Sequence, residues 1–317
     1  MTCKTIERYT LHRAVRRRAL TIALRVVSVA ASVLLSIALS VAQGPPPTDI
    51  PRVGPARGSL VIVGGRMDDK EIVERIISLA GGRDAPLVMI PTAGGALQYD
   101  EYWRGQRPFR EAGATDITVL HTYNPTVADT EEFVAPLRRA RGVFFGGGRQ
   151  WRLADAYLNT RTHRELLALL ARGGVISGSS AGASIMGSFL VRGDTGTNTL
   201  MIGDHVQGFG FLKGVGIDQH LLRRNRHFDL IEVVEAHPDL LGIGLDENTA
   251  IVVDGDRFEV IGQSYAVIYD NRRQIPPNGR FYFLAPGDRY DMGTREAWRP
   301  VETERPLDRV AKDPWTR

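Results

Sequence analysis

Cysteine is almost absent from this chain of 317 residues, which contains one, Cys3. Cys3 lies in an N-terminal segment with the pattern of a leader, so we expect the mature protein to contain no cysteine. This excludes a disulfide framework. The sequence also has no His-Glu-x-x-His motif or comparable histidine cluster that would suggest zinc. We therefore expect no metal and no cofactor, and a stability that comes from packing.

A surplus of positive charge is also missing outside the N-terminus. The formal net charge is +4, but residues 1–42 alone carry +6, so the remaining residues sum to −2. Binding to nucleic acid requires an excess of lysine and arginine on one face. The slightly acidic body therefore argues against a nucleic-acid partner. With 43% apolar residues, the chain can bury one large core or two modest ones.

Residues 1–42 have the pattern of a secretory signal peptide. The basic cluster Arg16-Arg17-Arg18 precedes an apolar run at 26–42 that ends in small residues. We expect cleavage after Ala42, a secreted or periplasmic protein, and no stable membrane association afterwards. Two alternatives stay open. The first is a twin-arginine route, which the pair of arginines matches weakly, and the second is an uncleaved anchor, for which the run is short against about 20 residues.

We expect a linker, one domain and a tail after the leader. Residues 43–57 contain five prolines and indicate an extended linker. Residues 58–285 form the predicted domain. Residues 286–317 combine prolines with charged residues and are expected to be a loosely ordered tail. The sequence shows no internal repeat and no second catalytic module.

Apolar runs alternate with helical patterns between Leu60 and Ile185. We expect buried strands at 60–63, 87–90, 117–120, 143–145 and in the run that ends at Gly178, with helices after Asp68 or Asp69 and near 104–112, 130–140 and 161–172. This alternation predicts an α/β fold with a doubly wound, mostly parallel central sheet. Four further short runs between 250 and 284 predict C-terminal β-hairpins that extend or flank the sheet.

The segment Gly178-Ser179-Ser180-Ala181-Gly182 follows the last of these runs. A Gly-x-Ser-x-Gly sequence between strand and helix is the pattern of a nucleophile elbow, in which a sharp turn presents the serine hydroxyl. The spacing selects Ser180 rather than Ser177 or Ser184. The alternative is a small-residue turn that only lets a helix pack close to a strand. A catalytic role therefore requires a histidine and an acid elsewhere.

His220 is the best-placed base. It ends a predicted strand at 214–219, and the loops after strands carry the ligands in open α/β sheets. The basic segment after it, 221–226, is expected to be helical. Spacing leaves the acid open, because a carboxylate at a strand end or in a loop can hold an imidazole in one tautomer. The candidates are Asp194, Asp204, Asp218, Asp246 and Glu247.

Three glycine-rich loops follow predicted strands. Gly64-Gly65-Arg66 and residues 91–95 could hold a phosphate, but neither completes a dinucleotide or P-loop motif, so tight turns are the simpler interpretation. The third loop is Gly146-Gly147-Gly148. Its N–H groups, above all that of Gly148, and the N–H of Ala181 are expected to form an oxyanion hole on opposite sides of the serine.

Four blocks of sequence, taken together and in this order, resemble the cyanophycinases, which are serine peptidases related to the aspartyl dipeptidase peptidase E. They lie at 147–150, 178–184, 216–220 and 244–250, and the similarity covers roughly residues 58–285. The resemblance implies a fold similar to class I glutamine amidotransferases and peptidase E, and a possible homodimer. It implies a Ser-His-Glu triad, which falls on Ser180, His220 and Glu247.

The resemblance also implies a substrate pocket beside the serine. The residues that match it are Gln150, Asp218, Gln219, Arg224 and Arg226. Asp229 stands where a third arginine is expected. The implied activity is hydrolysis of cyanophycin, multi-L-arginyl-poly-L-aspartate, to β-Asp-Arg dipeptides.

The carboxylate at Asp229 keeps other substrates open. An aspartyl dipeptidase, an isoaspartyl peptidase or an esterase would use the same triad on a different bond. A catalytically inactive peptide-binding homologue is the alternative of another class. Such a protein would keep the pocket without an activated serine.

Overall fold

The computed structural model describes residues 52–272 and 279–300. The predicted leader and its cleavage site lie outside the described residues, as do most of the linker and residues 301–317. Within the described ranges, none of the helices has the length and hydropathy that crossing a bilayer requires.

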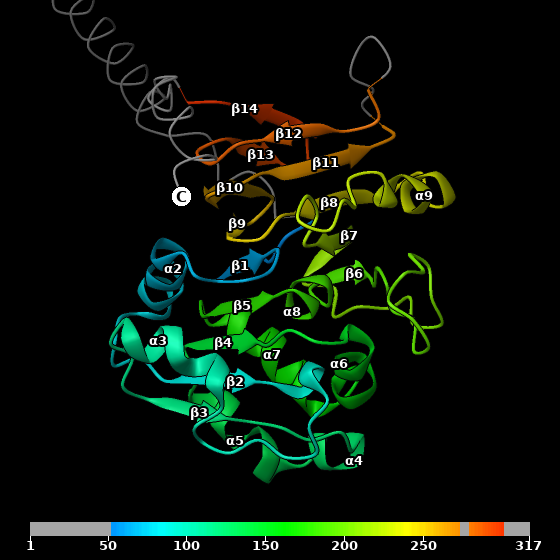
Figure 1. The fold of residues 1–317 in the computed structure, drawn as a ribbon. Coiled ribbons are helices and arrows are strands. Elements are labelled where there is room, and N and C mark those ends of the chain that lie inside the picture. The colour runs from blue at the N-terminus through cyan, green and yellow to red at the C-terminus, as the bar shows by residue number, and fades with distance from the viewer. Residues whose placement is uncertain (1–51, 273–278, 301–317) are drawn as a thin grey trace, which may run out of the picture. The chain divides into compact units, whose positions relative to one another are not determined.

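The larger of two sheets has nine strands in the order β14-β13-β10-β9-β1-β5-β4-β2-β3 (Figure 1). Its parallel part consists of β1 (Ser59–Val63), β5 (Val175–Ser179), β4 (Gly142–Phe145), β2 (Leu87–Ile90) and β3 (Ile117–Val119). Four antiparallel strands extend it, β9 (Thr249–Asp254), β10 (Arg257–Gly262), β13 (Arg289–Asp291) and β14 (Glu296–Trp298). Continuous apolar runs form the inner parallel strands because both of their faces are covered.

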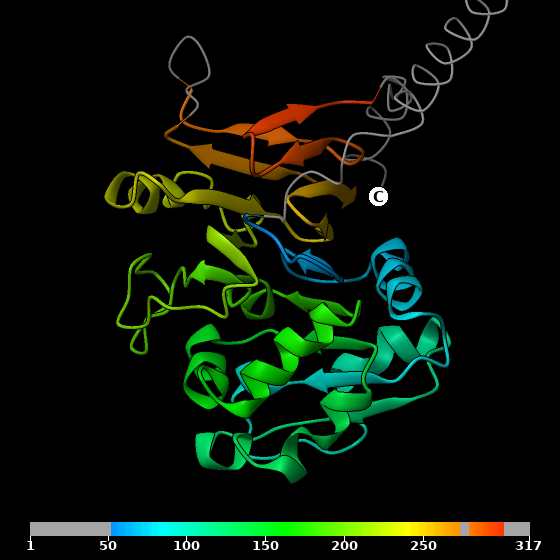
Figure 2. The ribbon, with the colours of Figure 1, turned by 180° about the vertical axis from the view of Figure 1, so that it is seen from behind.

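Helices cover the parallel strands from both sides. Helices α2 (Lys70–Ala80) and α3 (Arg107–Glu111) share one core with side chains such as Val61 and Met89. On the other side, α5 (Glu131–Arg139), α6 (Gln150–Tyr157) and α7 (Arg161–Ala171) share a core with Leu60 and Ile62. Figure 2 shows this second group in front of the sheet. The predicted doubly wound α/β arrangement is confirmed.

A second sheet has five strands in the order β12-β11-β8-β7-β6. They are β12 (Tyr282–Leu284), β11 (Ala266–Asp270), β8 (Leu241–Leu245), β7 (Leu212–Gln219) and β6 (Gly187–Phe189), and α9 (Asp229–Ala236) packs on β8 and β11. Strands β7 and β8 are parallel, so Gln219 and Leu245 lie opposite each other at the ends of these strands. The residues that follow them therefore meet at one edge.

Two expectations from the sequence are wrong. Residues 286–300 are not a loose tail, because they supply β13 and β14, and Tyr290 and Met292 are buried in the main core. The basic segment after His220 is not a helix but a series of turns over 221–225, and the next helix, α9, begins at Asp229. Charge and proline content gave no sign of the two buried apolar side chains that fix the last strands.

Candidate active site

Ser180 lies at the sharp turn between β5 and the short helix α8 (Ala181–Ser184). Its backbone has φ 58° and ψ −116°, an unfavourable conformation for a residue with a side chain. The Ser180 N–H donates to the carbonyl of Val63 at 3.1 Å. Helix α8 passes so close to β4 that a Cβ on Gly182 would be 2.3 Å from the carbonyl oxygen of Phe145. These contacts explain why the turn needs small residues, and they present the Ser180 side chain to the loops around it.

His220 reaches Ser180 from the second sheet. It follows β7, adopts φ 53°, and its N–H donates to the carbonyl of Gly64 at 2.8 Å. Its ring nitrogen Nε2 is 2.9 Å from the Ser180 Oγ. The ring rests on the backbone of Gly65, where an added Cβ would be 2.3 Å from His220 Cε1. We interpreted the glycine turn at 64–65 as a simple tight turn. The structure shows that it is also the backbone surface on which the His220 imidazole packs.

Glu247 lies on the other side of the imidazole. Its Oε1 is 2.7 Å from His220 Nδ1, and it follows the end of β8. The carboxylates of the other candidates are bonded elsewhere: Asp194 accepts from the Thr197 N–H, Asp204 from Thr195, Asp218 from Arg192, and Asp246 from the N–H groups of Leu222 and Arg223. Among the residues that the structure describes, Glu247 is the one carboxylate hydrogen-bonded to His220.

Burial lowers the pKa of His220 below the ordinary 6.5. The positive charges of Arg224 and Arg226 act in the same direction, and the hydrogen bond from His220 to Glu247 opposes them. The imidazole is therefore neutral at pH 7. With Nδ1 bonded to a carboxylate, its proton resides on Nδ1 and Nε2 is free to accept from the Ser180 hydroxyl.

The glycine loop after β4 borders the serine. A Cβ on Gly147 would be 3.3 Å from the Ser180 Cβ and 3.7 Å from its Oγ. Within the described part of the chain, the N–H groups of Gly147, Gly148 and Ala181 donate to no protein acceptor. The turn at 91–95 supports this loop, since the Arg149 N–H donates to the Ala93 carbonyl at 2.8 Å. Unpaired N–H groups beside a nucleophile are the donors that an oxyanion requires.

The predicted pocket residues differ in whether their polar groups are free to bind a ligand. Gln150 is fully buried, and its amide nitrogen donates to the carbonyls of Val191 and Arg192 at 2.7 and 2.8 Å, while its Oε1 has no partner in the described structure. Asp218 is also fully buried, and Arg192 holds both of its carboxylate oxygens at 2.8 and 3.1 Å. Asp218 therefore acts as an internal anchor for Arg192, and its carboxylate is not free for a ligand.

The arginines of the basic segment lie close to His220 and Glu247. The side chain of Arg224 is exposed, and its backbone N–H donates to the His220 carbonyl at 3.0 Å. Arg226 is partly buried and donates to the backbone carbonyl of Gln219 at 3.1 Å and to its side-chain oxygen at 3.3 Å. Arg223 is 69% exposed, and its Nε lies 4.0 Å from Glu247 Oε2.

Arg192 is the residue that sequence reasoning missed. Its side chain is 3% exposed, and besides Asp218 it binds the carboxylate of Asp229 and the carbonyls of Asn198 and Thr199. It adopts φ 55° in a loop without a recognisable motif, so no sequence pattern pointed to it. Arg192 pairs with two carboxylates at once, Asp218 and Asp229, and Asp229 is the residue that departs from the expected arginine set. Within 52–272 and 279–300, no group of three or more His, Cys, Asp or Glu side chains could hold a metal ion.

Replacing Gly65 with alanine is expected to reduce kcat by roughly 10²-fold or more, because the new methyl group would displace the His220 ring from Ser180. Gly65 has φ 151°, so backbone strain contributes as well. Gly81→Ala is the matched control, because Gly81 has φ 108° but nothing lies within 4 Å of its Cβ position. Steady-state kinetics and thermal unfolding of both variants separate the two effects. If both variants kept full activity, the claim that Gly65 positions the His220 ring would be wrong.

The model of peptidase family S51 matches residues 60–261 of this chain. The chain is 30% identical over 264 residues to a cyanophycinase from Geminocystis herdmanii, covering 76% of this chain and 96% of the relative. It is 31% identical over 263 residues to a cyanophycinase from Nostoc sp., covering 75% and 86%. Its structure is similar to the crystal structure of a peptidase from an acI-B1 actinobacterium, with a TM-score of 0.58 and 25% identity over 74% of this chain and 97% of that one.

Proposed function

Because this chain belongs to peptidase family S51, we propose that it is an exported exopeptidase that hydrolyses cyanophycin to β-Asp-Arg dipeptides, with Ser180, His220 and Glu247 as its catalytic residues. The chain is a serine-type hydrolase of the cyanophycinase kind. The observation that carries the proposal is the hydrogen-bonded series Ser180 Oγ, His220 Nε2, His220 Nδ1 and Glu247 Oε1, with distances of 2.9 and 2.7 Å.

The reaction follows from this order of groups. The Ser180 oxygen attacks the carbonyl carbon next to an aspartate residue, and its proton passes to His220 Nε2. The carbonyl oxygen becomes an oxyanion held by the N–H groups of Gly148 and Ala181. When the C–N bond breaks, Nε2 returns the proton to the leaving amine. Water then releases the acyl group from Ser180 by the same route, while Glu247 stabilises the charged imidazole.

The charges around the serine support a substrate with carboxylates. Arg224 and Arg226 lie beside His220, close enough for their charges to lower its pKa, and they would bind aspartyl or arginyl carboxylates through charge-assisted hydrogen bonds. Asp229 is not an unpaired carboxylate, because it shares the guanidinium of Arg192 with Asp218. This pairing reduces the negative charge that Asp229 presents beside Arg224 and Arg226, and so it supports the cyanophycin proposal.

The acid limb of kcat/KM is expected below pH 6.5, since His220 must be neutral to accept the serine proton and its pKa is lowered. Activity is lost as the pH falls through that pKa, because the protonated ring cannot act as a base. In Arg224→Gln the limb should move to higher pH, because one of the charges that lower the pKa is removed. Rate profiles between pH 4 and 8 give the comparison. A limb that stayed in place would contradict this source of the shift.

Export is the second part of the proposal, and the leader pattern of residues 1–42 supports it. We expect the mature protein to begin at Gln43. N-terminal sequencing of protein recovered outside the cytoplasm is the measurement. A product that kept Met1 and sedimented with membranes would identify the segment as an anchor.

Incubation with insoluble cyanophycin tests the proposed substrate. We expect the suspension to clear and β-Asp-Arg to appear by mass spectrometry, with neither change in Ser180→Ala. A parallel panel of α-aspartyl dipeptides, isoaspartyl peptides and short esters tests the alternatives. Hydrolysis of α-aspartyl dipeptides without clearing would place the protein with the aspartyl dipeptidases, and no hydrolysis of any member would favour an inactive peptide-binding homologue.

A further inference from the structure

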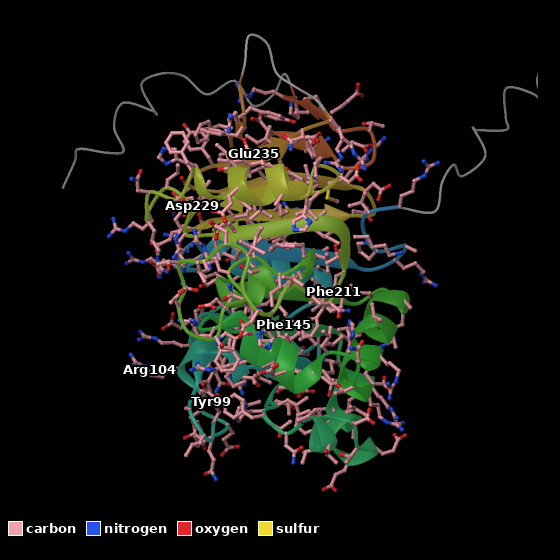
Figure 3. All side chains as sticks on the ribbon, turned by 90° about the vertical axis from the view of Figure 1, so that its right-hand side faces the viewer. Tyr99, Arg104, Phe145, Phe211, Asp229 and Glu235 are labelled. Carbon is pink, nitrogen blue, oxygen red and sulfur yellow. The ribbon has the colours of Figure 1, made fainter. Side chains whose placement is uncertain are left out.

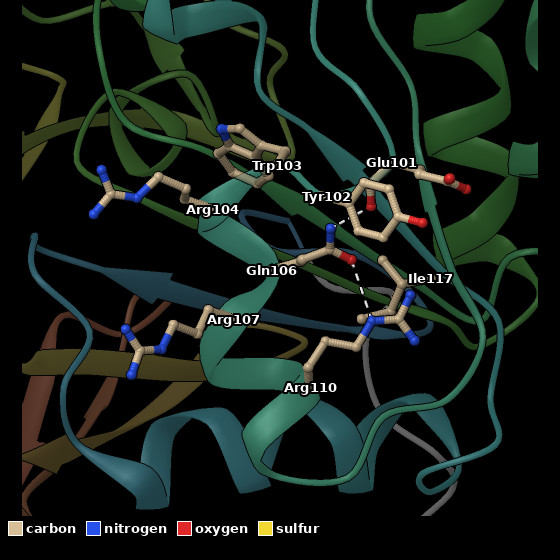
Figure 4. Close-up of a pocket in the computed structure, with 8 residues that line it drawn as sticks. All are labelled: Glu101, Tyr102, Trp103, Arg104, Gln106, Arg107, Arg110 and Ile117. Atoms are coloured by element: carbon tan, nitrogen blue, oxygen red, sulfur yellow. Dashed lines mark hydrogen bonds between the residues drawn. The ribbon is translucent and has the colours of Figure 1, made fainter.

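A cavity of about 410 Å³ lies beside the segment that leads into α3 (Figure 4). The catalytic steps above use none of its residues. Its lining comes from residues 101–110 and from Ile117. Ile117 belongs to β3, the edge strand of the larger sheet, so the cavity lies at the border of that sheet.

The centre of this cavity is held in place by hydrogen bonds. Gln106 is 5% exposed, and its side-chain amide donates to the Glu101 carbonyl and accepts from Arg110 Nε at 3.2 Å. Arg110 also donates to the carbonyl of Thr115 at 2.7 Å. Figure 4 shows Gln106 between Tyr102 on one side and the helix ribbon on the other. The cavity therefore has one side fixed by hydrogen bonds, and apart from the half-buried Trp103 and Ile117 its other lining side chains are exposed.

Trp103 connects this cavity to the glycine loop of the active site. A Cβ on Gly146 would be 2.9 Å from the Trp103 ring, and the next residue, Gly147, borders Ser180. Figure 3 shows Tyr99, Arg104 and Asp229 on the same side of the molecule. Asp229 is bound to Arg192, which also holds the predicted pocket residue Asp218, so the cavity residue Arg104 lies on the side of the molecule that carries these residues. A chain-like substrate held at Ser180 could therefore extend over Trp103 into the cavity.

The cavity offers groups of both charges. Arg107 pairs with Glu111, and Arg110 is bonded to backbone carbonyls, whereas exposed Arg104 has no ion-pair partner in the described part of the chain. Tyr102 is 77% exposed and presents its ring to solvent beside the carboxylate of Glu101. Figure 4 shows Arg104 and Arg107 projecting to one side of the segment and Tyr102 lying on the other. A carboxylate fits the first side, and a guanidinium fits the second through a cation–π contact and an ion pair.

We propose that this cavity is a distal subsite that binds one arginyl unit of the polymer away from the bond being cleaved. In cyanophycin each arginyl unit carries a free carboxylate and a guanidinium, and these are the two groups that the walls complement. The inference rests on the proposed function, because that function supplies the polymer. Arg104 and Tyr102 are its specificity-determining residues, and Trp103 forms the wall between the two sites.

Binding measurements in the Ser180→Ala background test the subsite without turnover. Calorimetry should give about tenfold tighter binding, equivalent to 1.4 kcal/mol, for a soluble β-Asp-Arg oligomer that spans both sites than for a single β-Asp-Arg unit. Arg104→Glu should remove this advantage of length, and Tyr102→Ala should reduce it. Arg139→Glu is the matched control and should retain it, because Arg139 is an exposed arginine that precedes the amino end of β4, away from the site.

Equal affinity for short and long oligomers, or an unchanged advantage in folded Arg104→Glu, would overturn the subsite. Circular dichroism of each variant establishes that it is folded. If Arg104→Glu does not fold, Tyr102→Ala provides the second test. The proposed function fails in a different way, when the unmodified protein binds the long oligomer but releases no β-Asp-Arg dipeptide from it. In that case the length advantage would still be present and the substrate assignment would be wrong.

Discussion

Replacing Ser180 with alanine is expected to reduce kcat by roughly 10⁶-fold, the scale on which removal of a serine nucleophile acts in other triads. The Ser180 Oγ is the atom 2.9 Å from His220 Nε2, so no acyl-enzyme can form without it. The residual rate should come from the N–H groups of the glycine loop and from substrate binding. Cyanophycin clearing and dipeptide release, measured over hours at high enzyme concentration, give the two rates.

Ser184→Ala is the matched control for Ser180→Ala. Ser184 follows in the same short helix, is fully buried, and its hydroxyl has no hydrogen-bond partner within the described residues. Removing that hydroxyl is expected to leave kcat within about threefold of the parent, since no buried group loses a partner. If Ser184→Ala abolished turnover and Ser180→Ala did not, the elbow serine would be wrongly assigned.

Replacing Glu247 with glutamine is expected to lower kcat by about 10⁴-fold, the cost of the equivalent change in a Ser-His-Asp triad. A glutamine keeps the size of the side chain but removes the negative charge that stabilises the imidazolium. It can also donate to Nδ1 and so favour the wrong tautomer. The KM should change much less than kcat, because Glu247 acts through His220 and does not contact the substrate.

Asp194→Asn is the comparison that decides between the acids. The Asp194 carboxylate accepts from the Thr197 N–H within its own loop, and an asparagine oxygen can accept the same bond. We expect activity close to that of the parent. Loss of activity in Asp194→Asn together with normal activity in Glu247→Gln would reverse the assignment of the acid.

Much of the fold follows from the sequence because its parallel strands are buried on both faces. The runs at 60–63, 87–90 and 143–145 are continuously apolar and lie at or within one residue of β1, β2 and β4. A helix after Asp68 or Asp69 was expected, and α2 begins after Asp69, which accepts from the Glu71 N–H as its N-cap. Local patterns were sufficient there, because the hydrophobic period of each element and the residues that begin and end it lie within its own stretch of sequence.

The candidate site was harder to predict because its parts come from two sheets. No local pattern shows that the strand before His220 leaves the first sheet, or that Gly64 binds the His220 N–H and so joins the two sheets. Spacing alone left five carboxylates open, and the resemblance selected Glu247. Arg192 was missed because its role depends on long-range contacts with Asp218 and Asp229. Helix α6 was missed because it follows the glycine loop without a capping side chain.

Labelling with a fluorophosphonate probe tests the central claim that His220 and Glu247 activate Ser180. Mass spectrometry of a tryptic digest should place a single adduct on Ser180 of the native protein. Glu247→Gln and heat-unfolded protein should label much more slowly, because an unactivated serine does not react with the probe. An absence of labelling in the folded protein, or an adduct on another serine, would contradict the account.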